Sequence, residues 1–131
     1  MKNSINQPSQ RQLRVAEQIR HVLAETLSRG HFHHPILMDA ASSVTVTEVR
    51  VSPDLKHATA YVLSLGGANM KEILPALNDE AHAFQKEINR QTQLKFTPKL
   101  QFRGDDMFDK AQRLDSLINN IQYSDQNEQE D

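Results

Sequence analysis

The sequence predicts an α+β sandwich, in which helices cover one face of a small three-stranded sheet. Two runs rich in β-branched residues, separated by a short turn, indicate an antiparallel hairpin. Apolar residues that recur every three or four positions on either side of this hairpin indicate helices. An alternating segment near residue 100 adds a third strand, so the expected order of elements is α-β-β-α-α-β-α.

The first helix is expected over residues 11–29. Ser9 and Gln12 have the spacing of a capping box at its start, and Gly30 stands where a left-handed residue commonly ends a helix. Its apolar residues repeat at intervals of three and four, as one buried stripe requires: Leu13, Ala16, Ile19, Leu23 and Leu27.

Residues 30–42 are predicted to be a connection without a helix, because Pro35 disfavours helix in this stretch. His31, His33 and His34 suggest a metal site. However, two adjacent histidines face one ion poorly, and no other set of ligands is visible. We therefore expect an ordinary loop, no metal and no cofactor.

The hairpin runs from residue 43 to residue 65, with Ser52-Pro53-Asp54-Leu55 as a type I turn in which Pro53 sets φ. The apolar positions of its first strand are Val44, Val46, Val49 and Val51. Under strict alternation the first two and the last two valines point to opposite faces. A β-bulge near Thr47-Glu48 restores a single apolar face, and this is the interpretation we favour. The alternative is burial on both faces.

A helical segment follows Gly66-Gly67, with Asn69 and Glu72 at capping-box spacing. Its apolar stripe consists of Ile73, Leu74, Leu77, Ala81, Phe84 and Ile88. Pro75 and the poor helix formers at residues 78–79 predict two helices joined by a kink.

The third strand is expected over residues 97–103, with Leu100 and Phe102 on its buried face. A last helix carries apolar residues from Phe108 to Ile121, and the acidic end that follows is expected to be disordered. Four phenylalanines are expected in the core: Phe84, Phe96, Phe102 and Phe108. These elements make one domain over residues 9–122, with flexible tails at 1–8 and 123–131.

Charge is distributed unevenly along the chain. Residues 1–103 hold 13 Lys and Arg against 9 Asp and Glu, whereas residues 104–131 hold 2 against 8. A basic body suits an anionic partner, although a solvated surface with an acidic tail explains the charge equally well. The N-terminal stretch has no apolar region typical of a secretory signal, and no apolar run is long enough for a membrane span. We expect a soluble, cytoplasmic monomer.

No enzyme motif is present: the chain lacks GxSxG, HExxH, a P-loop and GxGxxG. Binding is the remaining class of function, and basic side chains in several elements are placed to contact phosphates. Since no aromatic pair is expected on an open sheet face, recognition through base stacking on the sheet is not expected. The candidate RNA-binding residues are Arg11, Arg14, Arg20, Lys86, Arg90, Lys95, Lys99 and Arg103.

Several short motifs, in their order and spacing, resemble the ribosome-binding factor A family of bacterial small-subunit maturation factors. The resemblance runs from about Arg11 to Ile121. It rests on RVA at residues 14–16, on VTVT at 44–47, on VSPDL at 51–55, on ATAYV at 58–62 and on PxLxFxxD at 98–105. The family resemblance implies a type II KH-like fold in which an Ala-x-Gly kink replaces the usual GxxG. This kink aligns with Ala81-His82-Ala83, where Ala83 departs from the family's Gly.

The resemblance also implies a non-enzymatic function. Family members bind the free small (30S) subunit and its 16S rRNA rather than complete 70S ribosomes, and assist maturation of the rRNA 5′ end. A GTPase aids their release in some bacteria. No membrane or small-molecule substrate is implied. The alternative from the residues is a KH-like protein–protein adaptor whose basic face is merely solvated.

Overall fold

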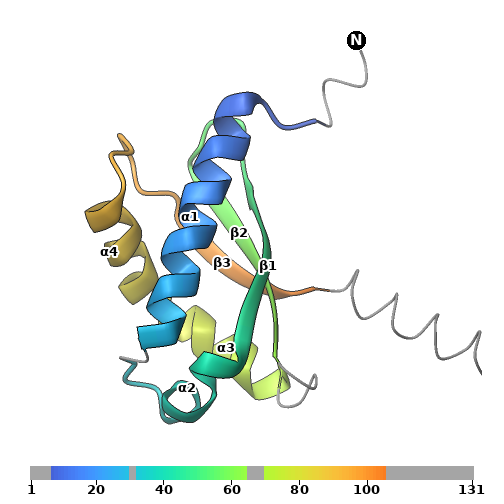
Figure 1. Ribbon diagram of the computed structural model, residues 1–131, viewed down its shortest axis with the longest axis vertical. Coiled ribbons are helices and arrows are strands. Elements are labelled where there is room, and N and C mark those ends of the chain that lie inside the picture. Colours follow the sequence, from blue (N-terminus) through green and yellow to red (C-terminus); the bar gives the residue numbers. More distant parts are fainter. Residues whose placement is uncertain (1–6, 30–31, 65–69, 106–131) are drawn as a thin grey trace, which may run out of the picture.

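The computed structural model describes residues 7–29, 32–64 and 70–105. The elements in chain order are α1 (Gln10–Arg29), α2 (Pro35–Ala40), the short 3₁₀ helix η2 (Ala41–Ser43), β1 (Val44–Val51), β2 (His57–Ser64), α3 (Met70–Asp79), α4 (Ala81–Gln91) and β3 (Lys99–Gly104). Helices α1, α3 and α4 and the three-stranded sheet form two layers (Figure 1). No helix in these ranges has the length and apolar content that crossing a membrane requires.

The sheet has the strand order β1-β2-β3, with β1 antiparallel and β3 parallel to β2. The register between β1 and β2 shifts between Val46 and Glu48, so the predicted bulge is confirmed. The four valines of β1 are each only 7% exposed. Because the bulge adds one residue, all four valines reach the same core.

The predicted hairpin turn is also confirmed. The Leu55 N–H donates to the Ser52 carbonyl at 2.8 Å. The Asp54 carboxylate accepts from the Ser52 hydroxyl at 2.6 Å and from the Lys56 N–H at 3.0 Å. The hydrogen bond from Ser52, and then that from Lys56, lower the pKa of Asp54. The chain reverses with Leu55 at a φ of 63°, the only positive φ of a non-glycine residue in the described ranges.

The capping box at the start of α1 is confirmed: the Ser9 N–H donates to Gln12 Oε1 at 2.8 Å, and the Gln12 N–H donates to Ser9 Oγ at 3.1 Å. The predicted burial of Leu13 is wrong, because Leu13 is 51% exposed. Gln12 takes the inward position of this turn, where its amide donates to the Val51 carbonyl of β1 at 2.8 Å. Further along, Val15 and Val22 join the predicted stripe in the core.

The prediction of a helix-free connection before the hairpin is wrong, since α2 and η2 lie there. Pro35 is the first residue of α2, where its missing N–H has no helical partner to lose. His34 caps this helix by accepting from the Ile36 N–H at 3.4 Å, so one of the three histidines has a structural role. His31 lies outside the described residues.

The second helical segment is two helices, as predicted. The break lies at Glu80, so Ala81, His82 and Ala83 form the first turn of α4. Pro75 lies inside α3 without ending it. The predicted capping box at Asn69, the helix from Phe108 and the acidic tail lie outside the described residues.

The helix pair is attached to the outer edge of β3 by two amide side chains. Asn78 of α3 accepts from the Phe102 N–H at 2.8 Å and donates to the Phe102 carbonyl at 3.1 Å. Gln85 of α4 accepts from the Leu100 N–H at 2.9 Å. Backbone groups that an edge strand leaves open are thereby paired with α3 and α4.

Candidate nucleic-acid interface

Helix α4 holds Lys86 and Arg90 on its solvent side. Phe84 and Ile88 of this helix are fully buried, and the centroid of the Phe84 ring lies 4.9 Å from that of Phe102 on β3. Because that side of α4 packs on the core, Lys86 and Arg90 lie on the outer side, one helical turn apart. Both positions agree with the prediction from the apolar stripe.

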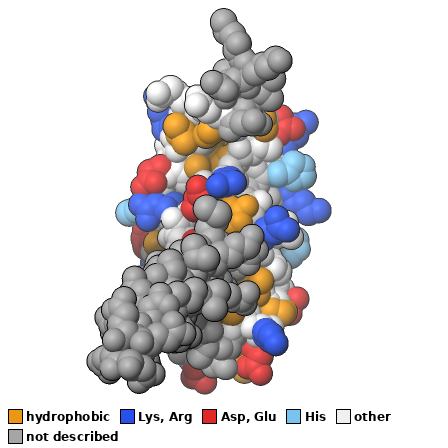
Figure 2. Space-filling view, turned by 90° about the vertical axis from the view of Figure 1, so that its right-hand side faces the viewer, with side chains coloured by type: hydrophobic (Ala, Val, Ile, Leu, Met, Phe, Trp, Pro, Cys, Tyr) orange, Lys and Arg blue, Asp and Glu red, His pale blue; other side chains and the backbone are white. Residues whose placement is uncertain are grey.

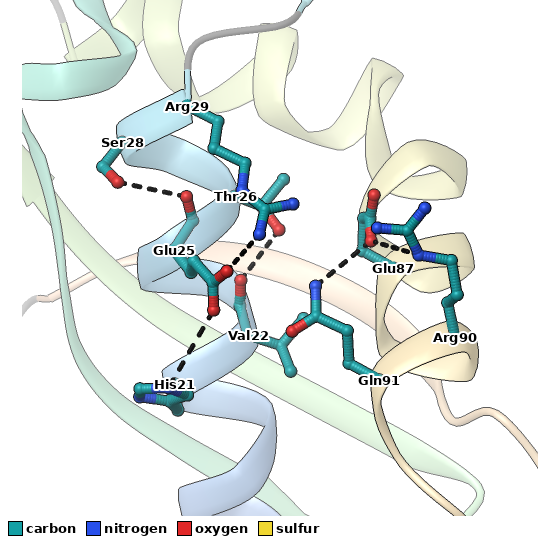
Figure 3. A network of polar contacts seen from close by, with 9 residues as sticks. All are labelled: His21, Val22, Glu25, Thr26, Ser28, Arg29, Glu87, Arg90 and Gln91. Carbon is teal, nitrogen blue, oxygen red and sulfur yellow. Dashed lines mark hydrogen bonds and ion pairs between the residues drawn. The ribbon is translucent and has the colours of Figure 1, made fainter.

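The two cations of α4 differ in how far they are neutralised. Arg90 Nε lies 3.4 Å from the Glu87 carboxylate (Figure 3). Lys86 has no ion pair within residues 7–29, 32–64 and 70–105. Figure 3 shows a matching arrangement on the facing helix α1, where Arg29 pairs with Glu25. The positive charge of Lys86 is therefore more available to an anion than that of Arg90.

Strand β3 places Lys99 and Arg103 on the other layer of the sandwich. Leu100 and Phe102 point into the core, so the exposed residues that alternate with them, Lys99, Gln101 and Arg103, point to the open face of the sheet. Lys95 lies on the loop that connects α4 to β3. This loop therefore lies between the cations of the helical layer and those of the sheet.

The open face of the sheet also holds Arg50, a basic residue that the sequence analysis did not select. Arg103 stands opposite Tyr61 in the parallel register, and Glu48 stands opposite Tyr61 on the other side. The Arg50 guanidinium lies 5.5 Å from the Tyr61 ring centroid, within cation–π distance. Val49 and Val51 are buried after the bulge, so Arg50 between them points to the open face. This alternation could have identified Arg50 from the sequence.

The arginines of α1 lie apart from this face. Arg14 lines a groove of about 750 Å³ between α1 and the C-terminal end of α4, together with Gln18, His21, Gln91 and Gln93. Arg11 is exposed one turn before Arg14. Arg20 is paired with Glu17, and the hydrogen bond from Arg20 lowers the pKa of the Glu17 carboxyl.

The eight predicted residues therefore do not form one patch. Five of them follow α4, the loop and β3, and we call them the α4–β3 surface: Lys86, Arg90, Lys95, Lys99 and Arg103. Residues 81–103 contain these five basic residues and one acidic residue, Glu87. Arg14 adjoins this surface through the groove, whereas Arg20 is neutralised by its own helix.

The side of the molecule formed by α1 and β1 carries charges of both signs. Figure 2 shows basic, acidic and hydrophobic side chains interspersed there. A groove of about 500 Å³ between α1 and β1 is lined by Leu13 and Pro53 and by both Glu48 and Arg50, whose charged atoms lie 3.2 Å apart. A surface with an excess of basic residues, such as the α4–β3 surface, attracts an anionic partner, whereas a surface on which opposite charges are paired does so less.

The chain is similar to known proteins over most of its length. The family model described as ribosome-binding factor A matches residues 11–118. Ribosome-binding factor A of Methylobacterium sp. (strain 4-46) is 51% identical over 111 residues, covering 85% of this chain and 78% of that protein.

A crystal structure and a fitted homology model show the same fold. The crystal structure of ribosome-binding factor A from Thermus thermophilus has a TM-score of 0.58 at 22% identity, covering 71% of this chain and 94% of that one. A homology model of the Thermus thermophilus factor, fitted into a cryo-EM map of a 30S complex, has a TM-score of 0.54 at 23% identity, covering 67% and 88%. The helix-strand-strand-helix-helix-strand order with its mixed sheet is thus the KH-like fold of these structures. Both by its sequence over most of its length and by its fold, the chain belongs to the ribosome-binding factor A family.

Proposed function

We propose that this protein is a non-enzymatic assembly factor that binds the free small (30S) ribosomal subunit through its 16S rRNA. In this role it assists maturation of the rRNA 5′ end and late subunit assembly, and it does not bind complete 70S ribosomes. Support comes from membership of the family and from the Thermus thermophilus neighbour, which is fitted into a map of a 30S complex. The observation that carries the proposal is the excess of basic residues along the α4–β3 surface, five against the one acidic residue Glu87.

Four of the five cations of this surface stand on a helix or a strand. Lys86 and Arg90 stand on a helix whose inner side is fully buried, and Lys99 and Arg103 stand on a strand paired with β2. Such positions suit contact with the backbone of folded RNA, where phosphate contacts set orientation and shape is recognised without base-specific bonds. The chain contains no GxxG segment, so the single-strand clamp of ordinary KH domains has no counterpart.

The test is a titration of isolated small subunits with labelled protein at several KCl concentrations. For roughly 3–5 phosphate contacts, the slope of log K against log salt is expected to be about −2 to −4. Replacing Lys86 and Arg90 together by alanine should make the slope shallower by about one to two units, with Lys86 responsible for the larger part.

The matched control is the double variant Lys71→Ala/Arg29→Ala. It also removes one lysine without an ion pair in the described ranges and one arginine paired with a glutamate of its own helix. It should leave the slope unchanged. A salt-independent affinity, or equal effects of the two double variants, would contradict the proposal and favour the protein–protein adaptor. Co-sedimentation with 70S ribosomes as strong as that with small subunits would contradict the choice of partner.

A further inference from the structure

Phe96 is a large aromatic residue that the fold holds in solvent. Its side chain was predicted to be buried, but it is 63% exposed. It lies on the loop between α4 and β3, which projects from the fold at the end opposite α2 (Figure 1). Isolated exposed apolar residues are common, so exposure alone does not assign a role to Phe96.

The anchoring of the loop distinguishes Phe96 from an incidental surface residue. Leu94 packs against the core on one side of it, and Pro98 is fully buried on the other. The Thr97 hydroxyl donates to Asn89 Oδ1 of α4 at 3.2 Å, and the Lys99 N–H donates to the Lys56 carbonyl at 2.8 Å. With the chain fixed on both sides, the backbone presents Phe96 outward in a defined position.

The positive charges near the Phe96 ring indicate the kind of partner that the ring contacts. The Lys95 ammonium lies 5.6 Å from the Phe96 ring centroid, and Lys99 follows three residues later. The chain has no acidic residue between Glu87 and Asp105. An aromatic face beside cations matches a nucleotide, because the base has a flat π-face and its phosphate is negatively charged.

We propose that Phe96 is a stacking platform for one unstacked nucleobase of RNA, with Lys95 contacting the adjoining phosphate. This rests on the proposed binding of rRNA and adds a contact of a different kind to the α4–β3 surface. Stacking accepts any base, so Phe96 contributes affinity at an exposed loop, bulge or end of the RNA rather than sequence specificity.

A fluorescence experiment tests the position of the base. The chain contains no tryptophan, so Phe96→Trp introduces a single reporter. Met38→Trp is the matched control, because Met38 is 64% exposed on α2, at the opposite end of the fold. Titration with isolated small subunits, and separately with protein-free 16S rRNA, should quench the indole fluorescence of the Phe96→Trp variant and change that of the Met38→Trp variant little. Equal responses of the two variants would overturn the proposal.

An affinity series tests the chemistry of the contact. Phe96→Ala should weaken binding to small subunits by about 5- to 150-fold, the range found for loss of one base–aromatic stack. Phe96→Tyr and Phe96→Trp should bind within about threefold of the wild type, because they keep a flat ring. Phe96→Leu should behave more like Phe96→Ala. Retention of affinity by Phe96→Leu would indicate an apolar pocket on a ribosomal protein and would overturn base stacking.

The salt dependence of binding distinguishes the contribution of the Phe96 ring from that of the Lys95 charge. Phe96→Ala should lower log K equally at every KCl concentration, whereas Lys95→Ala should make the slope shallower by about 0.7–0.9. If wild-type protein binds with a steep slope and Phe96→Ala binds equally well, only the stacking proposal fails. If wild-type protein does not bind small subunits, the proposed function fails. Circular dichroism melts of each variant should match the wild type, since Phe96 is outside the core.

Discussion

Replacing Asn78 by alanine should loosen the attachment of the helix pair to β3. The Asn78 amide makes two hydrogen bonds with the backbone of Phe102, at 2.8 and 3.1 Å. At about 0.5–1.5 kcal/mol for each bond, their loss costs about 1–3 kcal/mol. The higher helix propensity of alanine offsets roughly 0.5–0.7 kcal/mol of this loss in the free energy of unfolding. Asn78 is itself exposed, so water replaces part of what is lost, and the net destabilisation should be about 1 kcal/mol.

Urea unfolding followed by circular dichroism measures this change as a shift of midpoint at constant m-value. Asn89→Ala is the matched control, because it has the same gain in helix propensity but loses only one bond, to the exposed Thr97 hydroxyl. That variant should stay within about 0.5 kcal/mol of the wild type. Equal destabilisation by the two variants would refute the role assigned to Asn78. Asn78→Asp should be at least as destabilising as Asn78→Ala, because it sets a carboxylate oxygen against the Phe102 carbonyl.

Three further predictions follow from the fold. Val46→Asp should unfold the domain, because an unpaired carboxylate in the core costs several kcal/mol against a total stability of about 5–15; a cooperative thermal melt like that of the wild type would contradict the strand phase. Ala83→Gly should cost about 0.5–1 kcal/mol in urea unfolding, because Ala83 lies within the first turn of α4; an unchanged or increased stability would place the bend at residue 83. The lowered pKa of Asp54 adds stability that is present above the pKa of the unfolded state and is lost as pH falls through the folded value. The wild type should therefore lose more stability than Asp54→Asn between neutral pH and about pH 3, and equal losses in urea unfolding would contradict the turn contacts.

Most of the sheet could be predicted from sequence because its determinants are local. The phase of the four valines contains the information for the bulge, and Ser52-Pro53-Asp54-Leu55 specifies the reversal through its own hydrogen bonds. Alternation in β3 likewise placed Lys99 and Arg103 on the open face correctly. The direction in which β3 pairs with β2 depends on the path of the chain between them, and no periodicity encodes it.

The errors arose where tertiary contacts override local preference. Gln12, and not Leu13, points inward at the start of α1, because the Gln12 amide donates to the Val51 carbonyl of β1. Pro35 is an exception, because its effect is local: proline disfavours the interior of a helix but suits its first position. Phe96 is exposed because its neighbours, not its own hydrophobicity, fix the loop. For the candidate interface, the pairing of Arg90 with Glu87 was available from their spacing on one helix, whereas the approach of Arg14 to the end of α4 required the packed structure.

The parallel pairing of β3 with β2 has a consequence for the order of folding. The β1–β2 hairpin closes over only five residues, from Ser52 to Lys56, so its loop-closure entropy is small. Strand β3 can pair only after residues 65–98, which include both α3 and α4, have crossed back over the sheet. Because Asn78 and Gln85 bond to β3 itself, the strand and the helix pair should dock together as one late cooperative unit. Transient opening of that unit would separate Lys99 and Arg103 from β2 and leave the hairpin intact. We therefore expect the basic surface to be complete only after this unit has docked.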